Sequence, residues 1–274
     1  MAGRRGNWLR RGAVGVFAAL LGATPAAAAR FEATPPATLS PVLGSAQRAA
    51  IRLGLPAAPD PLRNGPAAAL RALTPIPRPA LLVRVSHSLP VTSRPGGGRV
   101  IGTLVSHARY SGQAITAWVM RTTRDGRFGL VPVAYSVPYR AGWIRLAGLR
   151  RASTPISVLV DLSRHRLTVS RFGRVIMSVP VATGSPFTPT PPGRYFVTER
   201  VPFAPSSAYG AFVFGISGIQ SRLPCCGNLL ALHGTNDPGS IGRSASAGCI
   251  RVGAAGLQRL RQLLWWGTPV VIQR

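Results

Sequence analysis

A histidine and a cysteine near the C-terminal end of the chain stand in a pattern that suits covalent catalysis. His233 precedes Cys249 by 16 residues, and a small-residue turn, Ser246-Ala247-Gly248, leads into the cysteine. A thiol reacts as its thiolate, and an imidazole within hydrogen-bond reach can take its proton. Small neighbours let a carbonyl group approach and expose backbone N–H groups to the oxyanion formed on attack. We therefore expect Cys249 to be a nucleophile and His233 to be its base.

The stretch around this pair carries a more specific pattern. His233-Gly234-Thr235 is followed by a loop and then by Ser246-Ala247-Gly248-Cys249-Ile250-Arg251. This arrangement resembles the catalytic signature of the L,D-transpeptidases, the YkuD-like cell-wall enzymes. A predicted hairpin from residue 156 and the run Thr188-Pro189-Thr190-Pro191-Pro192-Gly193 resemble the opening of the same domain. The resemblance covers residues 156–273.

The resemblance implies a reaction on peptidoglycan stem peptides. Cys249 would attack the carbonyl of the diamino acid that precedes a terminal D-alanine, and the amine of another stem would resolve the thioester. The Gly234 carbonyl would orient His233. No metal or organic cofactor is implied, and a carbapenem is expected to acylate the cysteine.

Other residues of the signature receive roles from the same resemblance. Backbone groups near Gly248, together with Ser246, would orient the turn and hold the oxyanion, and Arg251 and Thr235 would bind substrate or fix the loop. Two alternatives stay open. Water in place of the amine would make the chain an L,D-carboxypeptidase, and a vestigial cysteine site would make it a non-catalytic cell-wall-binding protein.

The elements that position these residues are predicted to be mostly strands. Apolar β-rich runs at residues 156–162, 166–171 and 175–181 indicate strands, and the Gly/Ser/Pro-rich stretch 201–227 indicates a long loop or cap. Leucines at helical spacing predict a helix over residues 254–264, before a last strand at 270–272. The fold class is thus α+β and β-rich, an L,D-transpeptidase-like β-sandwich with a C-terminal helix over residues 156–273.

The upstream sequence predicts three further segments. Short β-rich runs separated by Gly and Pro turns over residues 81–152 resemble a small all-β SH3-like domain. Residues 30–80 are rich in Ala and Pro and indicate a spacer. Residues 1–29 have a basic start, a short apolar run and Ala27-Ala28-Ala29, which predicts an exported protein with a signal peptide cleaved after Ala29 or kept as an anchor.

The charge and the other cysteines leave alternatives open. The chain has 33 basic and 6 acidic residues, a formal charge of +27, and contains no lysine. This excess reflects either genome composition or attraction to anionic envelope polymers. The sequence lacks zinc-ligand spacing, a basic helix and an RNA-binding aromatic signature, so no nucleic-acid partner is expected. Cys225 and Cys226 either pair with each other or stay reduced.

Overall fold

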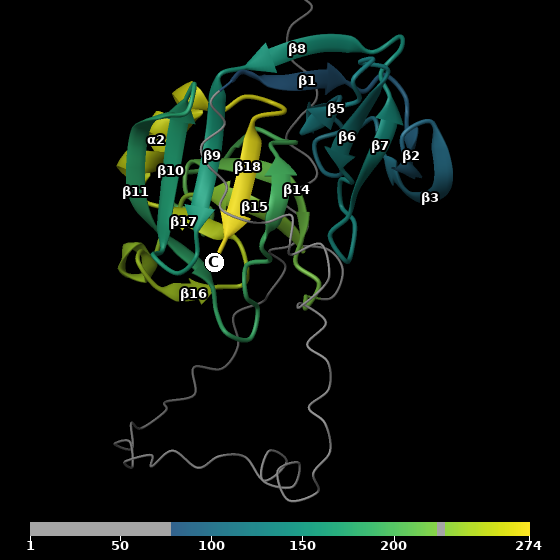
Figure 1. Ribbon diagram of the computed structural model, residues 1–274. Coiled ribbons are helices and arrows are strands. Elements are labelled where there is room, and N and C mark those ends of the chain that lie inside the picture. The colour runs from purple at the N-terminus through teal and green to yellow at the C-terminus, as the bar shows by residue number, and fades with distance from the viewer. Residues whose placement is uncertain (1–77, 224–227) are drawn as a thin grey trace, which may run out of the picture. The chain divides into compact units, whose positions relative to one another are not determined.

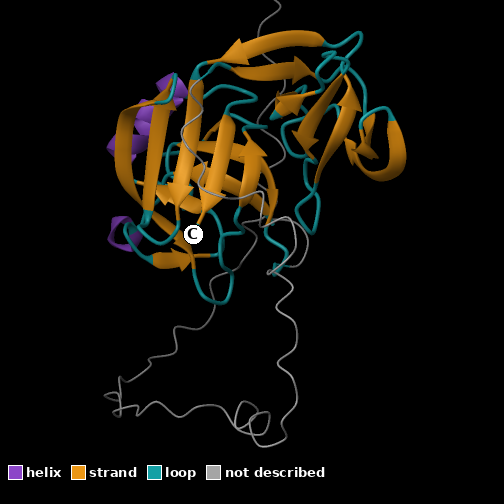
Figure 2. Cartoon of the chain, in the orientation of Figure 1, coloured by secondary structure: helices purple, strands orange, loops and turns teal. Residues whose placement is uncertain are grey.

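A computed structural model describes residues 78–223 and 228–274. These residues form mainly β-strands, which belong to two small sheets before Pro155 and one large sheet after it (Figures 1 and 2). The predicted signal peptide, residues 30–77 of the predicted spacer, and Cys225 and Cys226 lie outside the described residues.

The strands before Pro155 form two antiparallel sheets. One has the order β4-β1-β8 and the other β3-β2-β7-β6-β5. Gly96 ends the tight turn between β2 and β3 with a φ of 77°, a conformation that glycine adopts without strain. Strands β1 to β8 lie where the sequence predicts short β-rich runs separated by turns, over residues 81–152. The bounds are β1 (Ala80–Arg84), β2 (Leu89–Arg94), β3 (Gly97–Leu104), β4 (Thr116–Val119), β5 (Arg121–Thr122), β6 (Phe128–Pro132), β7 (Ala141–Arg145) and β8 (Arg150–Thr154).

The large sheet has the order β12-β18-β9-β10-β11-β17-β15-β14-β13, with β16 beside β11, and it curls on itself (Figure 1). Three of its pairs are parallel, β18 with β9, β15 with β17, and β11 with β16. The predicted hairpin from residue 156 is confirmed as β9–β10–β11. The bounds are β9 (Ile156–Asp161), β10 (Arg166–Arg171), β11 (Arg174–Gly184), β12 (Gly193–Phe196), β13 (Val201–Pro202), β14 (Phe212–Ile219), β15 (Leu229–His233), β16 (Ser244–Ser246), β17 (Ile250–Val252) and β18 (Pro269–Gln273).

The C-terminal helix α2 (Ala254–Leu263) confirms the predicted leucine pattern. Leu257, Leu260 and Leu263 are buried, and the intervening polar residues face outward. Each fully buried leucine contributes roughly 1.5–3 kcal/mol relative to an exposed one. Since Gly253 at the N-terminal end offers no side-chain cap, this apolar face is the main source of the helix's stability.

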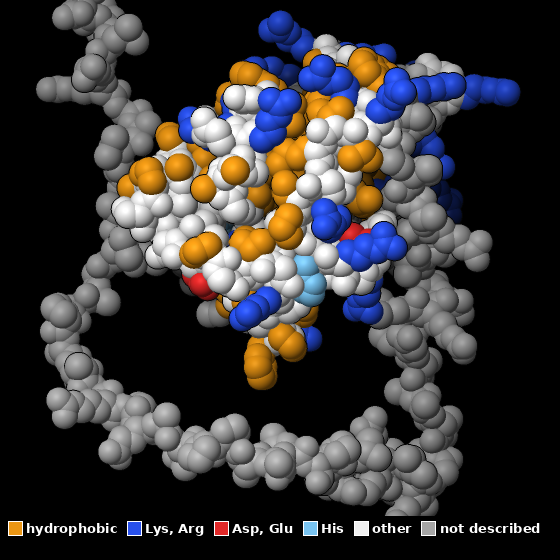
Figure 3. Space-filling model, turned by 90° about the vertical axis from the view of Figure 1, so that its left-hand side faces the viewer, with side chains coloured by type: hydrophobic (Ala, Val, Ile, Leu, Met, Phe, Trp, Pro, Cys, Tyr) orange, Lys and Arg blue, Asp and Glu red, His pale blue; other side chains and the backbone are white. Residues whose placement is uncertain are grey.

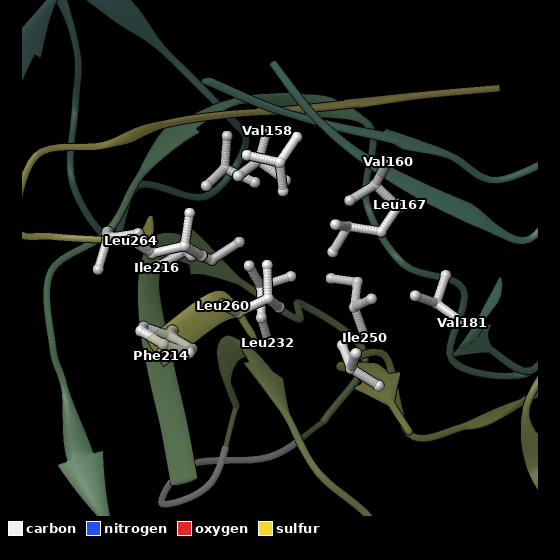
Figure 4. Packing of buried hydrophobic residues seen from close by; sticks show 14 of the residues in the cluster. Val158, Val160, Leu167, Val181, Phe214, Ile216, Leu232, Ile250, Leu260 and Leu264 are labelled. Atoms are coloured by element: carbon white, nitrogen blue, oxygen red, sulfur yellow. The ribbon is translucent and has the colours of Figure 1, made fainter. Parts of the chain in front are cut away.

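The core of the large sheet lies between its two halves and α2. Figure 4 shows side chains from β9 and β10 pointing toward those of β14, β15, β17 and the helix. Deletion of atoms here leaves a cavity because the neighbours can relax only in part. The labelled members are Val158, Val160, Leu167, Val181, Phe214, Ile216, Leu232, Ile250, Leu260 and Leu264.

The long loop predicted for residues 201–227 is wrong in part, because β14 occupies its middle. The glycine and serine content suggested a loop, but these residues belong to a strand that is buried on both faces. A Cβ atom at Gly215 would stand 3.1 Å from the Cβ of Glu199, and one at Gly218 would stand 2.7 Å from Leu230. The glycines are therefore required by close packing, which composition alone does not reveal.

The two parts of the described chain share buried side chains. Phe196 of β12 and Val271 of β18 lie in the apolar cluster of the upstream sheets, although both strands belong to the large sheet. Val270 and Ile272 on the same last strand pack in the other core. Strand β18 therefore contributes to both hydrophobic clusters, which explains why its residues from Pro269 to Ile272 are all buried.

The surface carries the basic excess expected from the sequence. On the face shown in Figure 3, arginine side chains stand among apolar and uncharged groups, with few acidic ones. Within residues 78–223 and 228–274, no helix has both the length and the apolar character needed to cross a bilayer.

Candidate active site

His233 and the segment of Cys249 lie on neighbouring parallel strands. His233 ends β15, and Cys249 immediately precedes β17. The register pairs Leu232 with Ile250 and His233 with Arg251. Since side chains alternate between the faces of a strand, Leu232 and Ile250 point into the core, whereas His233 and Arg251 share the opposite face. Cys249 lies in the bend that leads into β17, so the parallel pairing of β15 with β17 brings together two chain segments whose key residues are 16 apart in the sequence.

The imidazole of His233 is buried and held in one orientation. Its exposure is 4%, and Nδ1 lies 2.6 Å from the carbonyl oxygen of Gly234. A carbonyl oxygen only accepts hydrogen bonds, so Nδ1 carries the proton and Nε2 keeps its lone pair. Burial lowers the pKa of His233 to about 4, against the opposing effect of the Gly234 hydrogen bond, and the charge of Arg251 lowers it further. The ring is therefore neutral at pH 7 and can accept a proton through Nε2.

The thiol of Cys249 is also neutral at pH 7. Among the described residues, its hydrogen-bond acceptor is the carbonyl oxygen of Leu229, 3.7 Å from Sγ. Burial raises the pKa of the thiol, while a hydrogen bond with the backbone of Ala231 and the charge of Arg251 lower it. With burial dominant for both groups, the resting pair is a thiol and an imidazole rather than a thiolate and an imidazolium.

The turn before Cys249 is closed by Ser246. The serine hydroxyl donates to the carbonyl oxygen of Cys249 at 2.6 Å and accepts from the N–H of Gly248 at 3.0 Å. Gly248 has a φ of 119°, in the region that favours glycine. The sequence assigned both residues to orientation and oxyanion binding. In this geometry they fix the shape of the turn, and the Gly248 N–H already has an acceptor.

Two buried polar residues that sequence reasoning missed support this turn from behind. Thr190 donates to the carbonyl oxygen of Gly248 at 2.8 Å and accepts from the N–H of Gly184 at the same distance. Gln220 donates to the carbonyl oxygen of Pro189 at 2.8 Å, and its amide would lie 2.5 Å from a Cβ atom placed on Gly248. The Thr-Pro-Thr-Pro-Pro run was a signal for Thr190, whereas nothing in the local sequence indicated Gln220.

Arg251 and Thr235 organise the loop between His233 and the turn. Arg251 lies 3.6 Å from Asp237 through Nη1 and a carboxylate oxygen. Such a partly exposed pair adds little stability, about 0–1 kcal/mol, but it restricts where the guanidinium can point. The hydroxyl of Thr235 accepts from the N–H of Asp237 at 2.9 Å, beside the 3₁₀ turn η3 (Pro238–Ser240). Both residues expected to bind substrate are thus engaged within the loop.

Tyr209 is a further residue that the sequence did not single out for the site. Its ring meets the imidazole of His233 edge to face, with 5.0 Å between centroids. The next residue, Gly210, packs backbone to backbone against Gly234, since a Cβ atom on Gly210 would stand 2.7 Å from the Cα of Gly234. The turn between β13 and β14 therefore covers the histidine.

Comparison with known proteins agrees with this geometry. Residues 155–272 match YkuD, the L,D-transpeptidase catalytic domain. The chain is 30% identical over 154 residues to an L,D-transpeptidase YkuD of Bacillus licheniformis, which covers 56% of this chain and 87% of the relative. It is 32% identical over 120 residues to the YkuD protein of Bacillus subtilis, covering 44% of this chain and 67% of that one.

Solved structures of L,D-transpeptidases match this chain at lower sequence identity than the two Bacillus proteins do. An L,D-transpeptidase from Mycobacterium tuberculosis covers 70% of this chain and 98% of its own, with 17% identity and a TM-score of 0.40. A variant of the Enterococcus faecium L,D-transpeptidase matches with 19% identity and a TM-score of 0.36, and the match covers 44% of this chain and 50% of that one. On the strength of the family match and the two Bacillus relatives, the chain belongs to the YkuD family of cysteine-dependent L,D-transpeptidases.

Proposed function

We propose that this protein cross-links peptidoglycan stem peptides through an acyl-enzyme on Cys249, with His233 as the base. The observation that carries the proposal is the fixed imidazole. Its Nδ1–H is bonded to the Gly234 carbonyl, which leaves Nε2 as a proton acceptor on the strand that pairs with β17, the strand directly after Cys249. A thiol that must lose its proton during attack needs such a base.

The reaction begins when the Cys249 thiol turns from Leu229 toward His233. Nε2 takes the thiol proton while Sγ bonds to the carbonyl carbon of the diamino acid. The bond to the terminal D-alanine then breaks, and the imidazolium returns the proton to the leaving amine. The side-chain amine of a second stem attacks the thioester, which forms the cross-link and restores the thiol.

The oxyanion needs a backbone donor near the turn. Because the Gly248 N–H is directed to Ser246, we assign the N–H of Cys249 itself as the donor. A positive φ at Gly248 sets the direction of the following peptide group. Ser246 and Gly248 then act by holding this donor in place, which is the preorganisation that such stabilisation requires.

We assign Arg251 and Thr235 to the part of the site that meets the substrate. Arg251 keeps a positive charge near the thiol and the imidazole, since it lowers the pKa of both. We propose that its guanidinium, which lies 3.6 Å from Asp237, attracts the stem-peptide carboxylate. Thr235 shapes the loop that carries Asp237.

The segments before residue 156 have proposed roles in export and in cell-wall location. We propose that residues 1–29 direct export, that residues 30–80 act as a spacer and that residues 81–152 form an SH3-like β domain ahead of the catalytic domain at 156–273. The antiparallel pairing of the upstream strands supports the third assignment. Anionic envelope polymers are a further proposed partner, on the ground of the arginine excess.

Mass spectrometry of the purified protein with a tetrapeptide-containing muropeptide tests the function. We expect a cross-linked dimer and release of D-alanine. A tripeptide product alone would indicate an L,D-carboxypeptidase, and no product would favour a non-catalytic wall-binding protein. Cys225→Ala and Cys226→Ala serve as thiol controls that should keep turnover, whereas Cys249→Ala should lose it.

A strained lactam tests the nucleophile independently of the natural substrate. An acylating thiol with an oxyanion donor should open such a ring and keep the acyl group. An L,D-transpeptidase has been solved in complex with imipenem, so this carbapenem is the probe. We expect one adduct on Cys249 by peptide mapping. An adduct on another cysteine would contradict the assignment.

A further inference from the structure

A hollow of about 450 Å³ opens beside the C-terminal half of α2, and the proposed reaction makes no use of it. Its lining includes Phe212, the first residue of β14. The next residue, Val213, is paired with His233 in the register of β14 and β15. Paired residues share a face of the sheet and successive side chains alternate, so Phe212 lies across the sheet from His233. The hollow is therefore separate from the candidate active site.

Two arginines bring positive charge to this hollow. Arg200, just before β13, and Arg261 on α2 both line it. Their guanidinium carbons lie 5.7 and 5.0 Å from the centroid of the same ring, that of Phe212. Burial lowers the pKa of Arg200, and the charge of Arg261 lowers it further. The three ion pairs found in residues 78–223 and 228–274 involve other arginines, so the two cations stand close together with no carboxylate partner in this part of the chain.

The guanidinium of Arg200 is held in one orientation. Its Nη2 donates to the carbonyl oxygen of Arg261 at 2.8 Å, and the group lies 4.2 Å from the ring centroid of Trp265 and 5.4 Å from that of Trp266. Such contacts fix the planar group before any ligand arrives, which lowers the entropy that binding must overcome. Its Nε is buried and has no hydrogen-bond partner among the described residues. The fold therefore positions this cation without satisfying all of its donors.

Three glutamine side chains add further donors to the lining. The Gln113 oxygen accepts from the indole N–H of Trp266 at 2.8 Å, and the Gln258 oxygen accepts from Arg261 at 3.3 Å. The oxygen of Gln262 accepts from the guanidinium three residues before it, at 3.1 Å. Indole and guanidinium groups only donate, so each amide turns its oxygen to them and keeps its NH₂ group for another acceptor. The polar side chains of the hollow thus offer donors whose own acceptors are already used.

The arrangement of these donors fits a phosphodiester. They come from three separate segments, namely α2, the residue before β13, and Gln113 of the upstream region. A tetrahedral phosphate can accept from several directions, whereas the two oxygens of a carboxylate lie in one plane. The ring of Trp266 can pack against the carbons of an adjoining polyol or sugar. The lining residues on α2 are exposed, so a long chain can lie across the hollow.

We propose that this hollow is a binding site for one phosphodiester unit of an anionic envelope polymer, with Arg200 and Arg261 as its counter-ions. The inference deepens the proposed function and rests on it for the class of partner. It assigns the polymer to one place on the surface rather than to the arginine excess as a whole. The polymer then holds the enzyme at the wall without occupying the face of His233.

Titration calorimetry on the full chain tests the site with a synthetic glycerol phosphate hexamer. Arg261→Gln should weaken the Kd about tenfold, because it removes a charged donor group from the hollow. Arg171→Gln is the matched control, since this exposed arginine on β10 lies outside the hollow and its loss changes the net charge by the same amount. We expect it to change the Kd by less than about twofold at physiological ionic strength, because an exposed charge away from the ligand is screened.

Gln258→Glu offers the two arginines an internal counter-ion. The Gln258 oxygen already meets Arg261 at 3.3 Å, so a carboxylate there would form an ion pair at helical spacing. We expect the Kd for the hexamer to weaken at least about tenfold, as with Arg261→Gln, while the Tm is unchanged or higher. A cluster with a purely structural role would give the same Tm result with no greater loss of affinity than Arg171→Gln shows, and that outcome would overturn the inference.

The remaining outcomes separate the ligand from the function. Equal weakening by Arg261→Gln and Arg171→Gln would show diffuse attraction, and a glutamate hexamer bound as tightly as the glycerol phosphate hexamer would show no preference for phosphate. Either result would overturn the inference, and so would binding to phosphatidylglycerol vesicles with no binding of the hexamer. Cross-linking of synthetic stem peptides, which carry no phosphate, should be the same in all three variants. No turnover by the unsubstituted protein would refute the proposed cross-linking, while the hexamer titrations still decided the site.

Discussion

Acidification should destabilise the protein through His233 in a defined pH window. Burial lowers the pKa of this imidazole to about 4 in the folded protein, whereas in an unfolded chain it titrates near 6.5. Between these two values the unfolded state binds more protons than the folded state. The free energy of unfolding therefore falls as the pH falls through the window from about 6.5 to about 4.

The size of this effect follows from the difference between the two pKa values. A difference of about 2.5 units, at about 1.4 kcal/mol per unit, gives about 3.5 kcal/mol in full, of which about 3 kcal/mol is lost by pH 4, where the folded imidazole is half protonated. The side chain is almost fully buried, so solvent screening removes little of this. Asp125 and Asp161 have pKa values lowered below 3.8 by hydrogen bonds from Thr123 and Ser163 respectively, so their titration lies below the window.

Urea unfolding at constant ionic strength between pH 7.5 and 4 measures the loss. We expect the unsubstituted protein to lose about 3 kcal/mol more than His233→Gln over this range, because the variant has no imidazole at this position. The comparison uses the change with pH in each protein, so a different absolute stability of the variant does not matter. Equal losses in the two proteins would refute the reasoning that the imidazole is kept neutral by burial.

The same reasoning predicts how the thiol reacts. If Cys249 and His233 rest as neutral groups, alkylation by iodoacetamide should accelerate as the pH rises above 7, where the thiolate begins to form. A resting ion pair would instead react at a constant rate from about pH 5 upward. A plateau in that range would show that a thiolate and an imidazolium already exist before substrate binds.

Further predictions concern the site, the core and the charge. Cys249→Ala should abolish both turnover and the carbapenem adduct while circular dichroism shows an unchanged fold, and His233→Ala should prevent the adduct on the same timescale. Gly248→Ala should impair turnover at least tenfold. The new Cβ would lie 2.5 Å from the Gln220 amide, and the backbone conformation of this residue is unfavourable to alanine. A normal kcat in this variant would contradict the role of the turn. Leu260→Ala should reduce the free energy of unfolding by about 2–5 kcal/mol in a denaturant titration. Retention on isolated cell walls should fall steeply with salt in a sedimentation assay if the arginine excess holds the protein there, and salt-insensitive retention would count against that explanation.

The sequence was sufficient to predict most regular elements, and it indicated the proposed pair of Cys249 and His233. A histidine at the end of an apolar run and a cysteine after a glycine turn are local patterns. The hairpin from residue 156 and the helix with Leu257 and Leu260 follow from periodicity alone. These features depend on neighbours in the chain, which is why short windows reveal them.

The supporting contacts could not be predicted because they join residues far apart in the chain. Gln220 reaches Gly248 and Tyr209 reaches His233 only after β14 has paired with β15. Glycine in β14 suggested a loop, and the physical reason for it, the nearby Glu199, lies on another segment. No window of sequence contains both members of such a pair.

The position of β18 has a consequence for how the protein is made. This last strand lies inside the large sheet between β9 and β12, and its side chains enter both hydrophobic clusters. During synthesis, β9 must wait for residues 269–273 to emerge before it gains its parallel partner. Deletion of these residues would leave the facing edges of β9 and β12 unpaired, which is a hazard for aggregation. Quality control by proteolysis, rather than loss of a catalytic group, would then remove the truncated chain.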